Sequence, residues 1–198
     1  MTTAESDLKL KVMLEHTAAM HKHLCPRQVL GVRMGLYAAE LLGLAMPQTD
    51  KRVLAFVESD GCFADGLSAA TGCTLGHRTM RLFDYGKVAA TLVDSKTGRA
   101  IRIAPRADSR QRAAEAAPEA ANRWKGQLEA YQKIPTKLLF EATDVALNVD
   151  VAALVGKPGV RVSCARCKEE ILNQREVVCD GETLCMSCAG ESYWRASE

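Results

Sequence analysis

The chain of 198 residues is 47% hydrophobic, only 5% aromatic, and carries a formal net charge of +2 at pH 7. Its length allows one sizeable core with a small appendix, and a charge so near zero excludes the strongly basic surface of a typical nucleic-acid-binding protein. No run of about 20 apolar residues marks a membrane span, and polar residues 1–11 lack the apolar core of a signal peptide. Eight cysteines without an export signal are typical of metal ligands or reactive thiols, so we expect a cytoplasmic protein without disulfides.

Two helices are predicted ahead of the first strand. Apolar residues recur at helical spacing over residues 8–20, and a stronger helical pattern covers residues 26–44. Within the second helix, Gly31 and Gly35 form a small-xxx-small pair, which in a water-soluble protein indicates close helix packing. Gly43 is typical of a helix end.

The next segment predicts a central strand followed by a helix. Residues 52–58 contain a continuous apolar run, which is typical of a strand covered on both faces. A turn then leads into a helix that reaches Ala70 and places Cys62 at its start. Gly72 and Gly76 interrupt this helix.

Three further strands are predicted at residues 80–85, 88–93 and 100–103. Turn-forming residues fill the two gaps, at 84–87 and 95–98, so we expect these strands to form hairpins. The order of elements predicts an α+β fold with a largely antiparallel sheet and packed helices.

Residues 108–131 change in composition toward Ala, Arg, Glu and Gln, which favour a helix. Pro118 must kink this stretch or divide it into two helices. Because the amphipathic pattern is weak, we expect these helices to pack on a partner. Residues 135–143 predict another short helix, whereas residues 145–155 are ambiguous, with an alternation that hints at a strand.

The C-terminal region carries two Cys-x-x-Cys pairs separated by 17 residues. The gap of two residues lets both thiolates of a pair reach one ion, and two pairs complete a closed tetrahedral shell that is typical of structural zinc. A rubredoxin-like iron site would use the same ligands. So small a module has almost no core, so the metal must supply its folding energy. The predicted ligands are Cys164, Cys167, Cys185 and Cys188.

Residues 169–183, between the two pairs, can form a hairpin with its turn at residues 179–182. Cys179 lies in this turn, outside both pairs, and is not predicted to bind the metal. The chain is thus predicted to have three parts: an α+β core (residues 1–107), a helical linker and dimerisation segment (108–158), and a zinc-binding module (159–198).

A second candidate site begins with His21, His23 and Cys25. If this stretch is extended, the three side chains point the same way. Pro26 disfavours a helical conformation for Cys25 and suits the first turn of a helix, so Cys25 would lie at a helix N-terminus, where the macrodipole favours a thiolate. The alternative is a helix end followed by a buried cysteine and two surface histidines.

Two further cysteines compete to join this site. Cys62 and Cys73 lie 11 positions apart, and in one helix they would be separated by roughly 16 Å, too far to share an ion. Cys62, at the strand–helix junction, is the better partner, with Asp60 and Asp65 nearby as hydrogen-bond acceptors. Cys73 would join only if Gly72 turns the chain back.

The four residues predicted for this core site suit a zinc ion or another thiophilic transition metal with an open coordination position. Without a metal, Cys25 beside two histidines would be an activated nucleophile and the candidate catalytic residue. The predicted set is His21, His23, Cys25 and Cys62.

The run from His21 to Pro26, with residues 31–34, 57–66, 70–76 and 84–87, resembles the FmdE family of proteins related to formylmethanofuran dehydrogenase, over roughly residues 14–105. The resemblance implies an α+β core with a groove in which the matched histidines and cysteines cluster. It also implies a C-terminal zinc-ribbon or treble-clef-like module, and a homodimer whose helical segments cross between the two protomers. The family commonly has Gly where this chain has Lys22 and Arg27, and both substitutions add positive charge beside the groove.

Three functions follow as hypotheses. The first is a metal-binding protein accessory to molybdenum or tungsten redox enzymes related to formylmethanofuran dehydrogenase. The second is a stand-alone enzyme in which Cys25 or a metal-bound water attacks a formyl or carbonyl group. The third is a regulatory or interaction protein that uses its zinc module to contact a partner.

Overall fold

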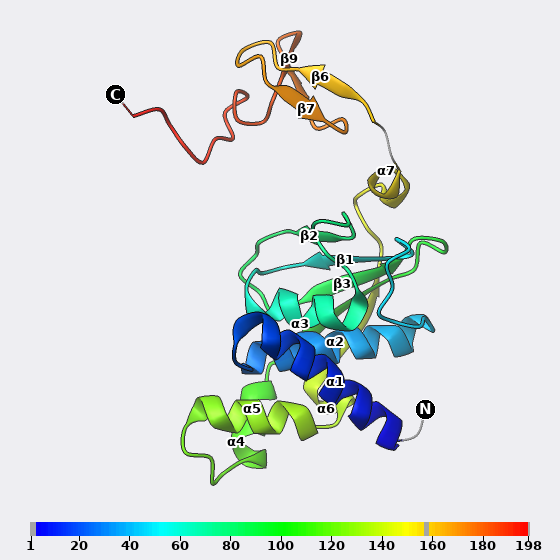
Figure 1. Cartoon of the computed structure of the whole chain (residues 1–198), viewed down its shortest axis with the longest axis vertical. Coiled ribbons are helices and arrows are strands. Elements are labelled where there is room, and N and C mark those ends of the chain that lie inside the picture. Colours follow the sequence, from blue (N-terminus) through cyan, green and yellow to red (C-terminus); the bar gives the residue numbers. More distant parts are fainter. Residues whose placement is uncertain (1–2, 157–158, 198) are drawn as a thin grey trace. The chain divides into compact units, whose positions relative to one another are not determined.

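The computed structural model describes residues 3–156 and 159–197, and the chain divides into two compact units, Met1–Val151 and Ala152–Glu198. The first unit is an α+β layer structure in which α2 and α3 cover one face of a five-stranded sheet (Figure 1). No helix among the described residues has the length and apolar character needed to cross a membrane. The predicted boundary at residue 158 lies outside the described residues.

The predicted pair of N-terminal helices is confirmed as α1 (Thr3–His21) and α2 (Pro26–Leu42). Helix α2 packs closely on α3 (Cys62–Thr71). A Cβ atom on Gly31 would collide with the carbonyl oxygen of Phe63, and one on Gly66 with the carbonyl oxygen of Gln28. The small residues of α2 therefore serve helix packing within this chain.

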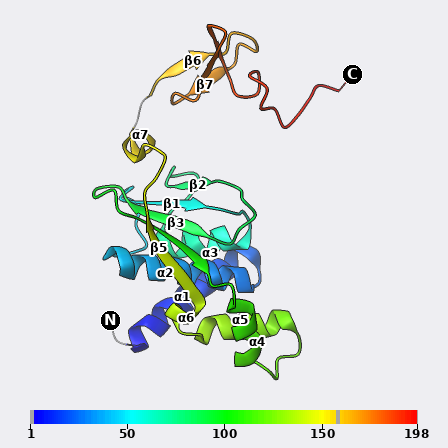
Figure 2. The ribbon, with the colours of Figure 1, turned by 180° about the vertical axis from the view of Figure 1, so that it is seen from behind.

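The sheet has the strand order β2-β1-β3-β4-β5. Strands β1 and β2 are parallel, and all the other neighbouring pairs are antiparallel, so the predicted largely antiparallel α+β fold is confirmed. In the rear view, β5 runs along the edge of the sheet beside β4 (Figure 2). The strands are β1 (Val53–Val57), β2 (Met80–Leu82), β3 (Ala90–Asp94), β4 (Ala100–Pro105) and β5 (Phe140–Val145).

One predicted hairpin is wrong. Strands β2 and β3 do not pair, because β1 lies between them. Helix α3 connects β1 to β2 as a crossover, and a crossover makes that pair parallel. The other predicted hairpin, between β3 and β4, is confirmed, and Gly98 in its turn has a φ of 73°.

The predicted helical segment divides at Pro118 into α4 (Ser109–Ala116) and α5 (Arg123–Lys133). Both pack within this chain, with Ala113 and Tyr131 in the main core. The short helix predicted at residues 135–143 is right only for the single turn α6 (Thr136–Leu139). The chain then enters β5 as the fifth strand, and the strand hinted at beyond residue 145 is replaced by the short helix α7 (Val151–Val155).

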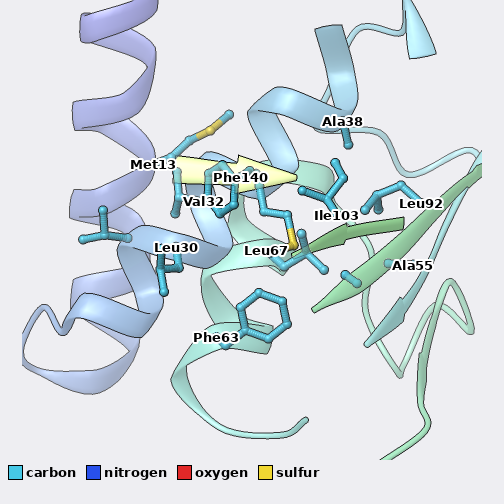
Figure 3. Close-up of a cluster of buried hydrophobic side chains, with 14 of the residues drawn as sticks. Met13, Leu30, Val32, Ala38, Ala55, Phe63, Leu67, Leu92, Ile103 and Phe140 are labelled. Atoms are coloured by element: carbon cyan, nitrogen blue, oxygen red, sulfur yellow. The ribbon is translucent and has the colours of Figure 1, made fainter. Parts of the chain in front are cut away.

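The core of the first unit lies between the sheet and helices α1, α2 and α3 (Figure 3). Alternate residues of β1 (Val53, Ala55 and Val57) belong to it, while Phe63 and Leu67 contribute from α3 without any solvent exposure. This aliphatic core fixes the ends of α2 and α3, and these ends carry the candidate thiol site.

The second unit consists of two small hairpins. Strand β6 (Arg161–Ser163) pairs with β7 (Glu170–Leu172), and β8 (Val177–Cys179) pairs with β9 (Glu182–Leu184). The predicted turn at residues 179–182 is confirmed, and Asp180 and Gly181 have the positive φ values, 51° and 82°, of a tight hairpin turn.

Candidate functional site

The four predicted zinc ligands come together in the second unit. Their ligand atoms all lie within 4.8 Å of one another. A tetrahedral zinc ion with Zn–S bonds of about 2.3 Å separates its sulfurs by about 3.8 Å. The Sγ atoms of Cys167 and Cys185 are 3.9 Å apart, so the donor set fits such an ion.

Backbone N–H groups of the Cys-x-x-Cys turns support these thiols as anions. The N–H of Cys185 donates to Sγ of Cys164 at 3.3 Å, and the N–H of Cys188 donates to Sγ of Cys185 at 3.4 Å. The first of these bonds is the main reason that the pKa of Cys164 is lowered to about 6. A lowered thiol pKa favours the thiolate, which is the form that binds metal. Cys179 lies outside this cluster.

The second candidate site differs from the extended geometry predicted for it. Helix α1 continues through His21, and Lys22 then takes the left-handed conformation with φ 61°. The side-chain alternation of a strand therefore does not apply, and the extended conformation predicted for residues 21–25 is wrong. The ring of exposed His23 turns back, and its Nδ1 lies 2.9 Å from the carbonyl oxygen of His21.

Cys25 occupies the predicted position at the start of α2. It is the N-cap residue with φ −122° and ψ 158°, as Pro26 requires, and only 7% of it is exposed. The buried side chain of Gln28 accepts a hydrogen bond from the N–H of Cys25 at 2.7 Å and donates one to the carbonyl of Thr17 at 2.9 Å.

Gln28 thereby ties the end of α1 to the start of α2 and holds the backbone of Cys25 in place. The sequence reasoning missed this role, although a glutamine three positions after a helix cap is the signature of a capping box.

Cys62 begins α3, directly after Gly61, whose φ of 76° makes the sharp entry into the helix. Burial, followed by a hydrogen bond with the Cys25 thiol, raises the pKa of Cys62. Cys62 is therefore a neutral thiol at pH 7, able to donate its S–H to Cys25. The close packing of α2 on α3 thus brings two thiols together from residues 37 positions apart.

His21 and Asp65 form a second pair beside the thiols. Nε2 of His21 lies 2.5 Å from a carboxylate oxygen of Asp65, which is one helical turn after Cys62. A carboxylate can only accept, so a neutral His21 donates its Nε2–H, and its Nδ1 keeps the free lone pair. Asp60, the other acid near Cys62, is exposed.

Cys73 lies elsewhere. It is 1% exposed, and its thiol donates to the carbonyl of Val53 at 3.3 Å. Val53 begins β1, whereas Cys62 follows the far end of that strand, so the two cysteines are more than about 13 Å apart along the strand. Burial raises the pKa of Cys73, as expected for a core thiol.

The groove in its described form is a thiol pair beside a histidine–aspartate pair. Within residues 3–156 and 159–197, three or more metal-ligating atoms approach within 4.8 Å of one another only in the four-cysteine cluster. The loop with the family-like residues 84–87 borders the turn before Cys62, because the carbonyl of Glu58 accepts from the N–H groups of Tyr85 and Lys87 at 2.9 and 3.1 Å.

Comparison with known proteins gives three findings. Residues 20–147 match the family model described as FmdE, molybdenum formylmethanofuran dehydrogenase operon. A probable S-adenosyl-L-methionine-binding protein of Archaeoglobus fulgidus is 31% identical over 210 residues, which cover 96% of this chain but 56% of the relative, so the chain spans little more than half of that protein. The crystal structure of an FmdE-like protein of tungsten formylmethanofuran dehydrogenase from Syntrophus aciditrophicus shares the fold, with a TM-score of 0.60, 24% identity, and coverage of 94% of this chain and 95% of the other.

Proposed function

This chain belongs to the FmdE family, and we propose that it is a metal-binding member that acts as an accessory to molybdenum or tungsten enzymes related to formylmethanofuran dehydrogenase. The observation that carries the proposal is the meeting of the Cys25 and Cys62 thiols at two helix starts inside the region matched by the family. In the same proposal the protein works in the cytoplasm, forms a homodimer through residues 108–158, and docks on its partner enzyme.

The four-cysteine cluster is proposed to hold a structural zinc ion. Four thiol donors within 4.8 Å of one another leave no position open for a substrate. Bound zinc would supply the folding energy that a core of Cys164, Ile171 and Leu184 lacks.

The groove is proposed to hold a second zinc or other transition metal, with ligands drawn from His21, His23, Cys25 and Cys62. Such an ion would act as a Lewis acid. Asp65 supports the role of His21, because a carboxylate on one ring nitrogen orients the other nitrogen for a metal or a proton. Two thiols side by side favour a thiophilic ion.

The His21–Asp65 pair also favours a second candidate function, that of an enzyme in its own right. The Cys25 sulfur would add to the carbon of a formyl or carbonyl group while the thiol proton passes to Nδ1 of His21. Asp65 would hold the imidazole in position and stabilise its charged form. This function predicts that Cys25→Ser abolishes turnover in a folded protein.

A third candidate rests on the second unit, where exposed apolar side chains favour an interaction module. Tyr193 is 98% exposed, Trp194 60% and Met186 48%. Removal of these side chains would then weaken partner binding and leave metal content unchanged.

Metal analysis of the purified protein tests the proposal. We expect two equivalents in the wild type, one in the Cys164→Ser/Cys167→Ser variant, and loss of that remaining one on Cys25→Ser. One equivalent in the wild type and none in the double variant would eliminate the groove as a metal centre and leave the thiol enzyme as the better account. For the accessory role, the tagged chain should co-purify a protein that contains molybdenum or tungsten.

A further inference from the structure

A cavity of about 930 Å³ opens between the N-terminal half of α1, the middle of α2 and the turn from α5 to α6. This volume lies in the range of about 300–1,000 Å³ that is usual for small-molecule sites. Its α1 lining comes from residues 6–10, whereas His21 ends that helix, so the cavity is separate from the cysteine groove.

Arg33 of α2 lies in the wall of this cavity and is held in one orientation. Its Nη1 donates to the carbonyl oxygens of Tyr131 and Ile134, both at 2.6 Å, and its Nη2 donates to Oγ1 of Thr136 at 2.9 Å. Three of the five guanidinium N–H groups are thus used to fasten α2 to the end of α5. The guanidinium is pre-positioned, so a ligand would not have to order it.

The remaining two donors, Nε–H and one N–H of Nη2, have no protein partner among the described residues. They form the edge of the guanidinium that matches a carboxylate. Two other arginines use that same edge in this way: Arg102 on Glu58 at 2.6 and 2.8 Å, and Arg52 on Asp94 at 3.2 and 3.1 Å. Arg33 has no such counterion within the described part of the chain.

Arg33 is nevertheless charged. Burial lowers its pKa to about 10, which still leaves it protonated at pH 7. A partly desolvated charge without a counterion is costly, and an anion placed on its free edge would recover that cost. The two carbonyl oxygens compensate only part of the charge.

The rest of the lining describes a ligand with one anionic end and an apolar body. Lys9 and Lys133 add positive charge to the wall, while Asp7 and Glu40 supply acceptors for a donor group on the ligand. The ring of Tyr37 offers an apolar surface, held by its stacking on Phe140 with ring centroids 6.5 Å apart.

We propose that this cavity binds a small organic anion, with its carboxylate or phosphate group held by the Nε–Nη2 edge of Arg33 and its apolar body against Tyr37. The bond is bidentate, as in the internal pairs of Arg52 and Arg102.

The test uses the full zinc-loaded chain and NMR titration with three probes: phenylacetate, phenylphosphonate and the neutral analogue phenylacetamide. We expect saturable shifts at Arg33 Nε–H and at backbone amides of residues 33–40 and 132–136 with at least one anion, and none with the amide. The better of the two anions identifies the head group as carboxylate or phosphate.

Three variants decide whether Arg33 is responsible. Arg33→Lys keeps the charge but loses the fork, and should raise the dissociation constant by about tenfold or more. Lys133→Gln should raise it about two- to threefold, and the matched control Lys137→Gln, which removes the same charge outside the cavity lining, should leave it unchanged.

If Arg33→Lys fails to fold, the comparison of Lys133→Gln with Lys137→Gln still decides. Equal binding of the amide and the anions, identical affinities in these two lysine variants, or no saturable shift at all would overturn the proposal and leave Arg33 as a cap on the end of α5.

Discussion

Two groups of cysteine thiols in this chain depend on the fold in opposite ways. In the second unit, four thiols surround one point, and the buried core around them consists of only Cys164, Ile171 and Leu184. In the first unit, the thiols of Cys25 and Cys62 stand at the starts of α2 and α3, on a large core of aliphatic side chains.

The difference shows which element of each site is the cause. In the second unit the ligands and their ion stabilise the hairpins, because so few apolar side chains are buried. In the first unit the packing of α2 on α3 places the thiols, so their proximity is a consequence of the core. One site should collapse without its metal, and the other should keep its shape.

Metal removal is the largest expected effect. Cys164→Ser/Cys167→Ser, or treatment with a strong zinc chelator, should unfold the hairpins of residues 159–197, since structural zinc contributes about 10–16 kcal/mol to such modules. In an NMR amide spectrum, signals of the second unit should lose their dispersion while those of the first unit stay in place.

Cys179→Ser is the matched control, because Cys179 lies in the same module but outside the cluster. It should keep both the metal and the spectrum. A second unit that remains folded after complete metal loss would show that the comparison is wrong.

Gly31→Ala should break the opposite side of the comparison. Its Cβ would meet the backbone of Phe63 and force α2 away from α3, at a cost of about 3 kcal/mol to the unfolding free energy of the first unit. Gly76→Ala, where a Cβ meets nothing within 4 Å, is the control. Denaturant unfolding followed by circular dichroism measures the cost, and zinc content should be unchanged in both variants.

The sequence predicts the two sites unequally for a physical reason. The zinc cluster is encoded by spacing, because two short turns bring all four thiols to one ion. At the groove, Pro26 was enough to place Cys25 at a helix start. The alternation argument failed at Lys22, because α1 continues to His21 and is fixed by the contact between Gln28 and Thr17, which no local pattern contains.

The same limit applies to the fold. The apolar runs predicted β1, α2 and α3, but the parallel pairing of β1 with β2 depends on how the α3 crossover lies on the sheet. Strand β5 follows a single helical turn, and its partner, β4, lies about 40 residues earlier. The free edge of Arg33 is likewise visible only once its three bonds are known.

Acid should separate the two units by a smaller energy. Arg52 donates to Asp94 and lowers the pKa of that carboxyl, so the stabilisation is complete above the ordinary Asp pKa of about 4 and is lost as the pH falls through the lowered native value. Asp94→Asn should reduce the stability of the first unit at pH 7 by about 1 kcal/mol, discounted because Arg52 is partly exposed, and by less near pH 2.

Thermal unfolding between pH 2 and pH 7 measures this difference, and Asp144→Asn, in an exposed ion pair with Arg99, is the control with little expected effect. Zinc release should occur at a higher pH than acid unfolding of the first unit, because the thiolates must protonate to lose the ion. Release of zinc only after the first unit unfolds would contradict the independence of the two sites.

The smallest effect tests whether the groove tolerates its two departures from the family. Lys22 has φ 61°, a conformation that costs a residue with a side chain roughly 1 kcal/mol, so Lys22→Gly should stabilise the first unit by about 0.5 kcal/mol. Arg27 lies in the first turn of α2, where Arg27→Gly should destabilise by about 0.5 kcal/mol. Equilibrium unfolding distinguishes the two signs. Opposite signs mean that Gly at position 22 serves the backbone, whereas Gly at position 27 must serve access to the Cys25 thiol; equal signs would refute this assignment.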